Sequence, residues 1–330
     1  ELPGKRDEDW RWTNLRGLIR QVPAPSTALD AASLPAGPFD ALADEVLVIA
    51  NGQGAANVGV GPGEAKTVAL RIVSRGDGAH AARISVDVGV AGRLTILESY
   101  EGDAGSYLGQ TGLVLSLAKD AMVERIVLAT DGAEGVTVSQ ADVDLAPGAR
   151  FAQTILTDGA RRQRLETVVR HPGGHADLRL DGVYLLADKR HADLTTAVTH
   201  QAVDGATRQL TKGVVRDQAR AVFQGRIVVA QGADRTDARM GHHALILSDR
   251  AEVDAKPELE IYADDVSCAH GNTVGALDED ALFYARQRGI PEAEARALLT
   301  EAFIGEVIDR IEHEGARDLV RAWAAERLRV

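Results

Sequence analysis

The residues best suited to chemistry in this sequence lie in one run near its C-terminal end. Cys268 is the only cysteine among the 330 residues, and His270 follows two positions later. Successive side chains of a strand alternate between two faces, so an extended run would present Cys268 and His270 on the same side. A thiolate and an imidazole suit a soft or borderline metal such as iron or zinc. Two ligands are too few to hold a metal ion, so we expect the others to come from elsewhere, most simply from a second chain.

Two other pairs of polar residues do not form such a site. Asp264 and Asp265 are adjacent, so in a strand they would face opposite ways, and a turn or cap is the expected role. His242 and His243 are adjacent in the same manner, and we expect them to be structural. A catalytic carboxylate pair would instead need two acids that face each other across a cleft.

Two further motifs fail on their spacing. His171 and His175 are spaced like ligands on a helix, but the intervening Pro172-Gly173-Gly174 excludes a helix and favours a solvated turn. The segment from 58 to 67 resembles a phosphate-binding loop. There Ala65 replaces the glycine that should precede Lys66, so its backbone would not cradle a phosphate in the usual way. We therefore expect no metal site at the two histidines and no nucleotide site in the segment from 58 to 67.

The composition limits the partners and the compartment. A formal net charge of −12 argues against nucleic acid or an anionic membrane as the main partner. One cysteine excludes a disulfide within the chain and fits a reducing cytosol. No apolar run reaches the roughly 18–20 residues that a membrane helix needs. We expect a cytoplasmic protein that binds neither nucleic acid nor membrane.

The hydrophobic pattern divides the chain into three parts. Residues 1–43 read as an irregular or helical cap, because prolines interrupt any longer helix. From 44 to 275 short runs with apolar residues at every second position alternate with clusters of Gly, Asp and Pro, which is typical of many short strands joined by turns. Residues 276–330 change to a helical period. The β region predicts a sandwich, a barrel or a β-solenoid.

The last part predicts three helices. Asp278 is a plausible N-cap for a helix from Glu279 to Arg288, and Pro291 suits the first turn of the next helix. That second helix carries an apolar stripe, which Gly315 interrupts before a final helix. The stripe either packs on the β region and caps its open end, or docks a partner. It consists of Ala295, Leu298, Leu299, Ala302, Phe303, Val307, Ile308 and Ile311.

Several segments of this chain resemble the SufB/SufD family of iron–sulfur cluster assembly. The strongest are YADDVSCAHGNTVG and the following LDEDALFYARQRGI, and the similarity is continuous from about Phe223 to Glu306. KRDEDWRWTNL, from Lys5 to Leu15, is also similar, and together with the single cysteine it fits the SufD branch. The resemblance implies a mainly β fold. In it a right-handed parallel β-helix is flanked by an N-terminal cap and a C-terminal helical region.

The resemblance also implies a function. Members of this family act as non-catalytic scaffold subunits, so this chain would pair with SufB and bind the SufC ATPase through its C-terminal helices. An iron–sulfur cluster or iron would form transiently at the SufB interface, with nothing tightly bound to the chain alone. The matching residues here are Cys268 and His270 for metal. The residues expected to bind SufC are Leu298, Leu299, Ala302, Phe303 and Val307.

Two alternatives stay open at this point. Parallel β-helices also host carbohydrate-active enzymes of the polysaccharide lyase or hydrolase type, and a cleft with an acid pair would favour that function. A purely structural homodimer would show an interface poor in metal ligands. For the isolated chain we expect a homodimer that stands in for the SufB pair.

Overall fold

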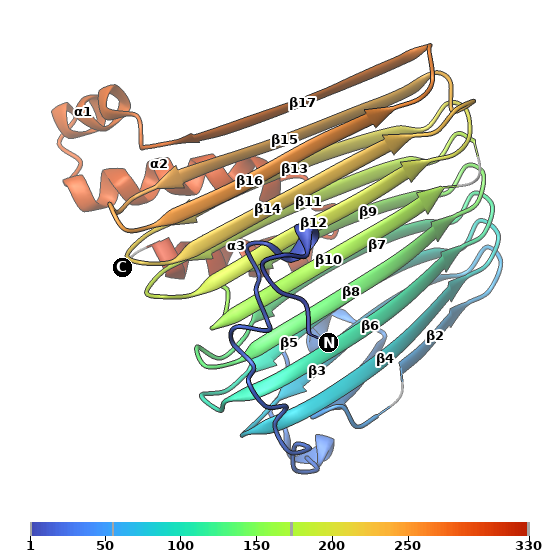
Figure 1. The fold of residues 1–330 in the computed structure, drawn as a ribbon, viewed down its shortest axis with the longest axis horizontal. Helices are drawn as coiled ribbons and strands as arrows, with labels where there is room; N and C mark the ends of the chain where they lie inside the picture. Colours follow the sequence, from blue (N-terminus) through green and yellow to red (C-terminus); the bar gives the residue numbers. More distant parts are fainter. Residues whose placement is uncertain (1, 55, 172–173, 329–330) are drawn as a thin grey trace.

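The computed structural model describes residues 2–54, 56–171 and 174–328. Within these ranges the chain begins with three short 3-10 helices, continues through 17 strands and ends in three α-helices (Figure 1). The 3-10 helices are Glu8–Trp10, Ala31–Ser33 and Asp40–Leu42. The strands fill the region from Glu45 to Gly275, and the α-helices follow it.

The strands alternate along the chain between two parallel sheets, so two consecutive strands make one coil of a solenoid (Figure 1). This topology confirms the predicted parallel β-helix. The odd-numbered sheet contains, in spatial order, β1 Glu45–Ala50, β3 Ala65–Ser74, β5 Arg93–Gly102, β7 Met122–Thr130, β9 Arg150–Thr157, β11 Asp177–Leu186, β13 Ala206–Val215, β15 Thr236–Ile246 and β17 Val266–Gly275. The even-numbered sheet contains β2 Ala56–Val60, β4 Gly78–Val88, β6 Tyr107–Leu117, β8 Val136–Leu145, β10 Arg162–His171, β12 His191–His200, β14 Arg220–Val229 and β16 Glu252–Ile261.

The space between the sheets, the lumen, is filled by every second side chain of each strand. Ile84, Leu113 and Ala141 are in register on β4, β6 and β8, and all three are buried. Each such row continues from coil to coil, so removing its apolar surface from water stabilises all the coils that it crosses. The period-two pattern of the sequence is therefore the pattern of the lumen.

The corners of the solenoid repeat one backbone conformation. Asp120, Asp188 and Asp217 have left-handed backbones with φ of 58°, 58° and 60°. Aspartate tolerates this region better than most residues. The carboxylate of Asp217 also accepts the backbone N–H of Asp188 at 2.9 Å, which links the corners of neighbouring coils. The Asp and Gly clusters of the sequence thus mark places where the chain changes sheet.

Buried polar groups also occupy the lumen. Arg125 donates to Glu98 at 2.7 Å and to Gln153 at 2.6 Å, and Arg125 and Glu98 are buried. His171 contradicts the expectation of a solvated turn, because it is the buried last residue of β10 and its ring lies 4.0 Å from that of His200. Residues 172–173 lie outside the described residues.

The helical tail packs on the outer face of the odd-numbered sheet. It consists of α1 Glu279–Gln287, α2 Glu292–Ile308 and α3 Glu314–Leu328. Its buried side chains, which include Ile304, Val307 and Val320, form one apolar cluster with Ile126 and Val183 of the sheet. The tail therefore covers a face of the solenoid, and the expectation that it caps the open end is wrong. Gly315 also lies inside the first turn of α3 and does not mark the break between helices.

Polar contacts fix the tail at several points of the same sheet. Glu124 on β7 accepts the backbone N–H groups of Glu312 at 2.7 Å and of His313 at 3.0 Å, directly before α3 begins. Arg310 forms an ion pair with Asp181 at 3.0 Å. These contacts place the tail in one register on the solenoid, which apolar packing alone would not specify.

The N-terminal segment lies on the outer face of the other sheet. The guanidinium of Arg164 on β10 is fully buried beneath the Trp10 ring, at 4.4 Å from its centroid. Arg164 donates to Asp193 on β12 and to the carbonyl of Asp9, both at 2.8 Å, and the Thr13 hydroxyl donates to the same Asp193 carboxylate. The N-terminal segment, which has little regular structure, is thus held on the sheet by the buried ion pair of Arg164 and Asp193.

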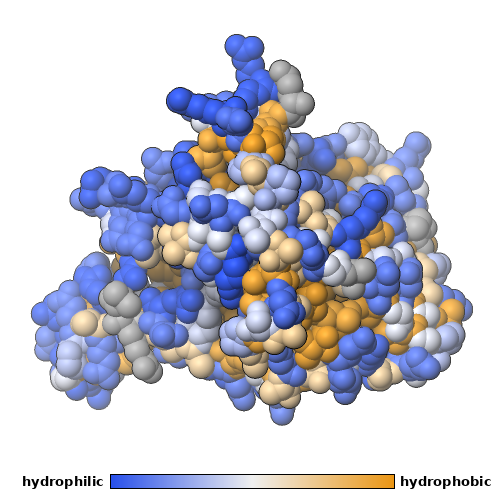
Figure 2. Space-filling view, turned by 90° about the horizontal axis from the view of Figure 1, so that it is seen from below, coloured by the Kyte–Doolittle hydropathy of each residue, from blue (hydrophilic) through white to orange (hydrophobic). Residues whose placement is uncertain are grey.

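The first coils leave the other end of the solenoid open. Figure 2 views the molecule from below, where β2 and β4 lie in Figure 1, and shows apolar surface between polar side chains. Val46 on the edge strand β1 is one of the large apolar residues with an exposed side chain.

Because several histidines are buried, we expect the protein to lose stability in mild acid. An unfolded histidine takes up a proton near pH 6.5, whereas burial lowers the pKa of His200 to about 3. Between these values the unfolded chain binds more protons, so the free energy of unfolding falls by about 2 kcal/mol for such a histidine between pH 7 and pH 5. Urea unfolding at both pH values measures this loss. His200→Gln should reduce it by about that amount, and equal losses in both proteins would contradict the prediction.

Candidate functional site

The strands β16 and β17 form the C-terminal end of the solenoid. β17 pairs with β15, and β16 pairs with β14. In the described part of the chain neither strand has a neighbour on its other side, and both lie at one end of the molecule (Figure 1). A strand edge presents unpaired N–H and C=O groups, which favour pairing with another chain.

Cys268 and His270 lie on β17, at this open edge. Cys268 is opposite Ala238 and His270 is opposite Met240, and both of these β15 residues are buried in the lumen. Because residues in register on parallel strands share a face, Cys268 and His270 both belong to the lumen side of the last strand. Cys268 is half-buried against the core, while His270 is exposed. The thiol and the imidazole therefore sit where a further coil would cover them.

The thiol of Cys268 is not activated within this chain. Burial raises the pKa of Cys268 above its ordinary value, and the nearby Asp237 carboxylate adds to the effect. Metal binding needs the thiolate, so a bound cation would have to displace the proton. Among the described residues, no three His, Cys, Asp or Glu side chains gather in a way that could hold a metal ion. The donors on β17 are thus part of a site that this chain does not complete.

His242 and His243 point to opposite sides of β15. His242 is buried in the lumen, where it donates to or accepts from Tyr184 at 2.8 Å and Asn272 at 2.6 Å. His243 faces outward and contacts the Thr273 hydroxyl at 2.7 Å. Both histidines thus link β15 to side chains of β17, and His242 also reaches Tyr184 in the lumen. These are structural contacts.

The remaining sequence motifs take structural positions. Asp264 and Asp265 lie in the bend between β16 and β17, and the carbonyl of Asp265 accepts the backbone N–H of Arg235 at 2.5 Å. The segment from 58 to 67 is a strand, a turn and a strand, in which the Glu64 carboxylate accepts the N–H of Gly61 at 2.9 Å. A phosphate loop needs a helix after the turn, so this segment does not have that architecture.

The apolar stripe of α2 is divided between two surroundings. Val307 is fully buried between the tail and the odd-numbered sheet, and Phe303 packs against the same cluster with the Lys212 ammonium 4.5 Å from its ring centroid. Leu298 is 48% exposed, Ala302 is exposed and Leu299 is half-buried. Of these residues, Leu298, Leu299 and Ala302 are therefore accessible to a partner, and the predicted role of Val307 in partner binding is not retained.

Two exposed aromatic residues on α1 were not singled out by the sequence pattern. Phe283 and Tyr284 are 62% and 60% exposed, whereas Leu282 on the same helix is buried. The Asp278 carboxylate accepts the N–H groups of Asp280 and Ala281, which confirms the predicted N-cap and fixes the start of α1. With that start known, the helical period places Leu282 inward and its aromatic neighbours outward, which is the signal that could have found them.

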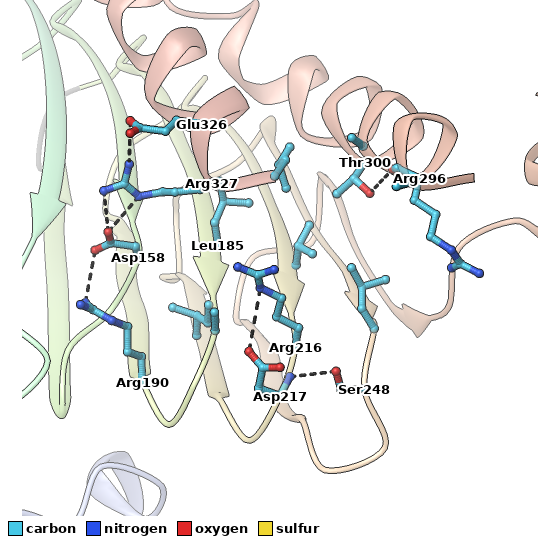
Figure 3. A pocket seen from close by; sticks show the side chains of 17 residues that line it. Asp158, Leu185, Arg190, Arg216, Asp217, Ser248, Arg296, Thr300, Glu326 and Arg327 are labelled. Carbon is cyan, nitrogen blue, oxygen red and sulfur yellow. Dashed lines mark hydrogen bonds and ion pairs between the residues drawn. The ribbon is translucent and has the colours of Figure 1, made fainter. Parts of the chain in front are cut away.

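A cleft of about 600 Å³ separates α2 and α3 from the corners that follow β11 and β13 (Figure 3). Its carboxylates are paired with arginines. Asp158 contacts Arg327 at 2.7 Å and Arg190 at 3.6 Å, and Asp217 lies 4.0 Å from Arg216. Glycoside chemistry needs two carboxylates that act on one bond, and these acids instead neutralise neighbouring guanidinium groups. The cleft is a joint between the tail and the solenoid.

The comparison with protein families agrees with this geometry. A family model described as "SUF system FeS cluster assembly, SufBD core domain" matches residues 71–303, which include β17 and most of α2. The chain belongs to the SufBD family. Its members take part in iron–sulfur cluster assembly, so the thiol and the imidazole on β17 occur in a family whose work involves iron.

Individual SufBD relatives support the assignment. The iron–sulfur cluster assembly protein SufD of Escherichia coli is 30% identical over 99% of this chain and 89% of its own length. A SufBD family protein of Synechocystis is 30% identical over 69% of this chain and 52% of the relative. The chloroplastic protein ABCI7 of Arabidopsis thaliana is 29% identical over 72% of this chain and 51% of the relative. Across the described residues, no helix has the length and apolar character needed to span a bilayer.

Proposed function

We propose that this chain is a non-catalytic scaffold subunit of a SufB–SufC–SufD-type complex that assembles iron–sulfur clusters. The observation that carries the proposal is the position of Cys268 and His270 on the free edge strand of a SufBD solenoid. The two donors suit iron, and the cluster is the cargo of the complex. The single thiol fits a reducing compartment such as the cytosol.

The proposed first partner is a SufB chain that covers β16 and β17. Such a chain would satisfy the unpaired backbone groups of these edges and supply the ligands that Cys268 and His270 lack. A cluster or iron would then be held between two chains and released when they separate. Covering the edge also removes water from the Cys268 thiolate, which strengthens its attraction to a cation.

The proposed second partner is a SufC-type ATPase that docks on the exposed part of the tail. The exposed Leu298, Leu299 and Ala302 on α2, with Phe283 and Tyr284 on α1, provide an apolar surface for it. ATP hydrolysis would take place in that partner. The C-terminal half of α2 is packed on the odd-numbered sheet, and polar contacts join the tail to the same sheet. A movement of α2 would therefore displace this sheet and alter the interface at β17.

We expect Cys268→Ala and His270→Ala to impair cluster formation in cells and leave the fold nearly intact. Neither side chain is a large buried core residue, so each substitution should cost little stability. Complementation of a strain that lacks the native subunit measures the first effect, and calorimetry measures the second. Ser267→Ala, on the opposite face of the same strand, is the matched control. Normal cluster formation in both test variants would show that the metal role is wrong.

Leu298→Glu combined with Phe283→Ser should weaken binding of the SufC-type ATPase by tenfold or more. Each buried apolar side chain contributes about 1.5–3 kcal/mol, and 1.4 kcal/mol corresponds to a factor of ten in affinity. Calorimetric titration with the purified ATPase measures the change. Val90→Glu alters an equally exposed apolar residue far from the tail in sequence and should leave binding unchanged. Removing the tail is a poorer test, because it would expose the apolar face of the odd-numbered sheet.

We expect the isolated chain to form a two-fold homodimer through residues 260–275. A two-fold interface uses the same patch on both chains, and the free edge of β17 offers its backbone groups to a second copy. Light scattering at tens of micromolar measures the mass, and addition of SufB should convert the homodimer into a heterodimer. A monomer at that concentration, or a dimer that leaves residues 260–275 exposed, would count against this proposal.

A further inference from the structure

A hydrogen-bonded chain runs from the interior of the solenoid to its open edge. It begins at Tyr184 on β11, passes through His242 on β15 and ends at Asn272 on β17. Asn272 lies two residues after His270, and both belong to the lumen side of β17. At about 3.3 Å per residue, their Cα atoms are about 7 Å apart along the strand. The chain of bonds thus ends next to His270 on the same face, and about 13 Å along the strand from Cys268.

The positions of the oxygen and nitrogen atoms define the donor and the acceptor of each hydrogen bond in this series. Asn272 offers its Oδ1 atom to His242 Nδ1, and an oxygen can only accept, so Nδ1 must carry the proton. The other ring nitrogen, Nε2, is then bare and accepts the Tyr184 hydroxyl. Burial lowers the pKa of His242 to about 4, which keeps the ring neutral near pH 7, and the two hydrogen bonds then select the tautomer.

The surrounding side chains hold the histidine ring in position. Phe223 of the opposite sheet stacks on His242 with a centroid distance of 4.6 Å and an interplanar angle of 9°. Gly213 on β13 makes room for Tyr184, because a Cβ atom at that glycine would lie 1.8 Å from the tyrosine ring. The ring of Tyr184 therefore leans across β13 to reach β15. Such supported geometry is typical of groups that orient a functional side chain.

The fixed orientation leaves the Asn272 amide with two N–H donors to use. Its Oδ1 points back toward β15, so its planar NH₂ group points away from β15 toward the uncovered end. Within the described residues this NH₂ group makes no hydrogen bond. A group that binds there must be an acceptor, and an anion is favoured because a hydrogen bond to a charged acceptor is stronger than one to a neutral acceptor.

We propose that Asn272 donates a hydrogen bond to an anionic sulfur of the iron–sulfur cargo at Cys268 and His270, and that His242 and Tyr184 are positioning residues for its amide. This inference rests on the proposed function of the chain. Hydrogen bonds to the sulfurs of a cluster are one of the factors that set its reduction potential. Asn272 would thus influence how readily the cargo accepts an electron, without being a ligand itself.

The free protein allows the first test. ¹⁵N NMR of the imidazole at pH 7 distinguishes a protonated ring nitrogen from a bare one. We expect the Nδ1–H tautomer for His242. We also expect Asn272→Ala to change its Nδ1 signal and to leave the stacking on Phe223 in place. The Nε2–H tautomer would require the opposite amide orientation, in which Asn272 presents an acceptor to the cargo, and would overturn the inference.

The second test uses the complex of this chain with its SufB and SufC partners, loaded without oxygen with ferrous iron and inorganic sulfide. Loss of a hydrogen bond to sulfur disfavours the reduced state, so Asn272→Ala should shift the midpoint potential of the cluster to more negative values. Asn272→Asp, which adds a negative charge, should shift it further. His242→Phe keeps the aromatic stacking but frees the amide, and should reproduce part of the shift. Asn272→Ser retains one donor and replaces the alanine variant if that variant does not load.

Thr273→Ala is the matched control, because Thr273 is the next residue on β17 and faces outward to His243. Its potential should equal that of the unaltered complex. Equal potentials in the Asn272 variants, with the cluster formed normally, would overturn the inference and leave the proposed function standing. That result would also be expected if the amide binds a backbone carbonyl of the partner. A cluster of unchanged amount and potential in both Cys268→Ala and His270→Ala would instead overturn the metal role on which the proposed function rests.

Discussion

The parallel register of the strands is the constraint on which the rest of this structure depends. Each coil satisfies its backbone hydrogen bonds only through the coils before and after it, and each lumen row gains its burial from the same stacking. Interior coils are therefore complete, whereas the coils at the two ends are not. Cys268 and His270 lie on the edge strand of the last coil, and the proposed function assigns a second chain to complete it.

The outer faces of the solenoid show how this fold accepts further elements. The tail covers the odd-numbered sheet through apolar rows and a few polar contacts, and the N-terminal segment covers the even-numbered sheet through the buried Arg164. Breaking such a buried pair by removing one partner leaves an uncompensated charge, which costs about 3–5 kcal/mol. Both segments are thus fixed relative to the coils. A force applied to α2 is consequently transmitted to the sheet that ends in β17.

Local patterns in the sequence were sufficient for much of this architecture. The i, i+2 rule placed Cys268 and His270 on one face, and the Asp278 cap marked the start of α1. The parallel β-helix itself came from the family resemblance, because period two alone left a sandwich or barrel open. The apolar stripe of α2 contains both the exposed Leu298 and the buried Val307. Which of them contacts the sheet depends on how the helix lies on it, and the sequence does not show this. His171 was misjudged because a turn signal begins directly after it.

The network that ends at Asn272 could not be read from the sequence, since its members lie on strands that are distant along the chain. It also shows why polar groups are tolerated in the lumen near the open end. The Tyr184 hydroxyl and His242 Nε2 are hydrogen-bonded to each other, so neither is an unpaired buried group. The other ring nitrogen of His242, Nδ1, is hydrogen-bonded to Asn272. The orientation of an exposed amide is thereby set by His242, one coil deeper, and by Tyr184, three coils deeper. The side chain of Asn272 on the edge strand is in this way held by hydrogen bonds that reach into the interior of the solenoid.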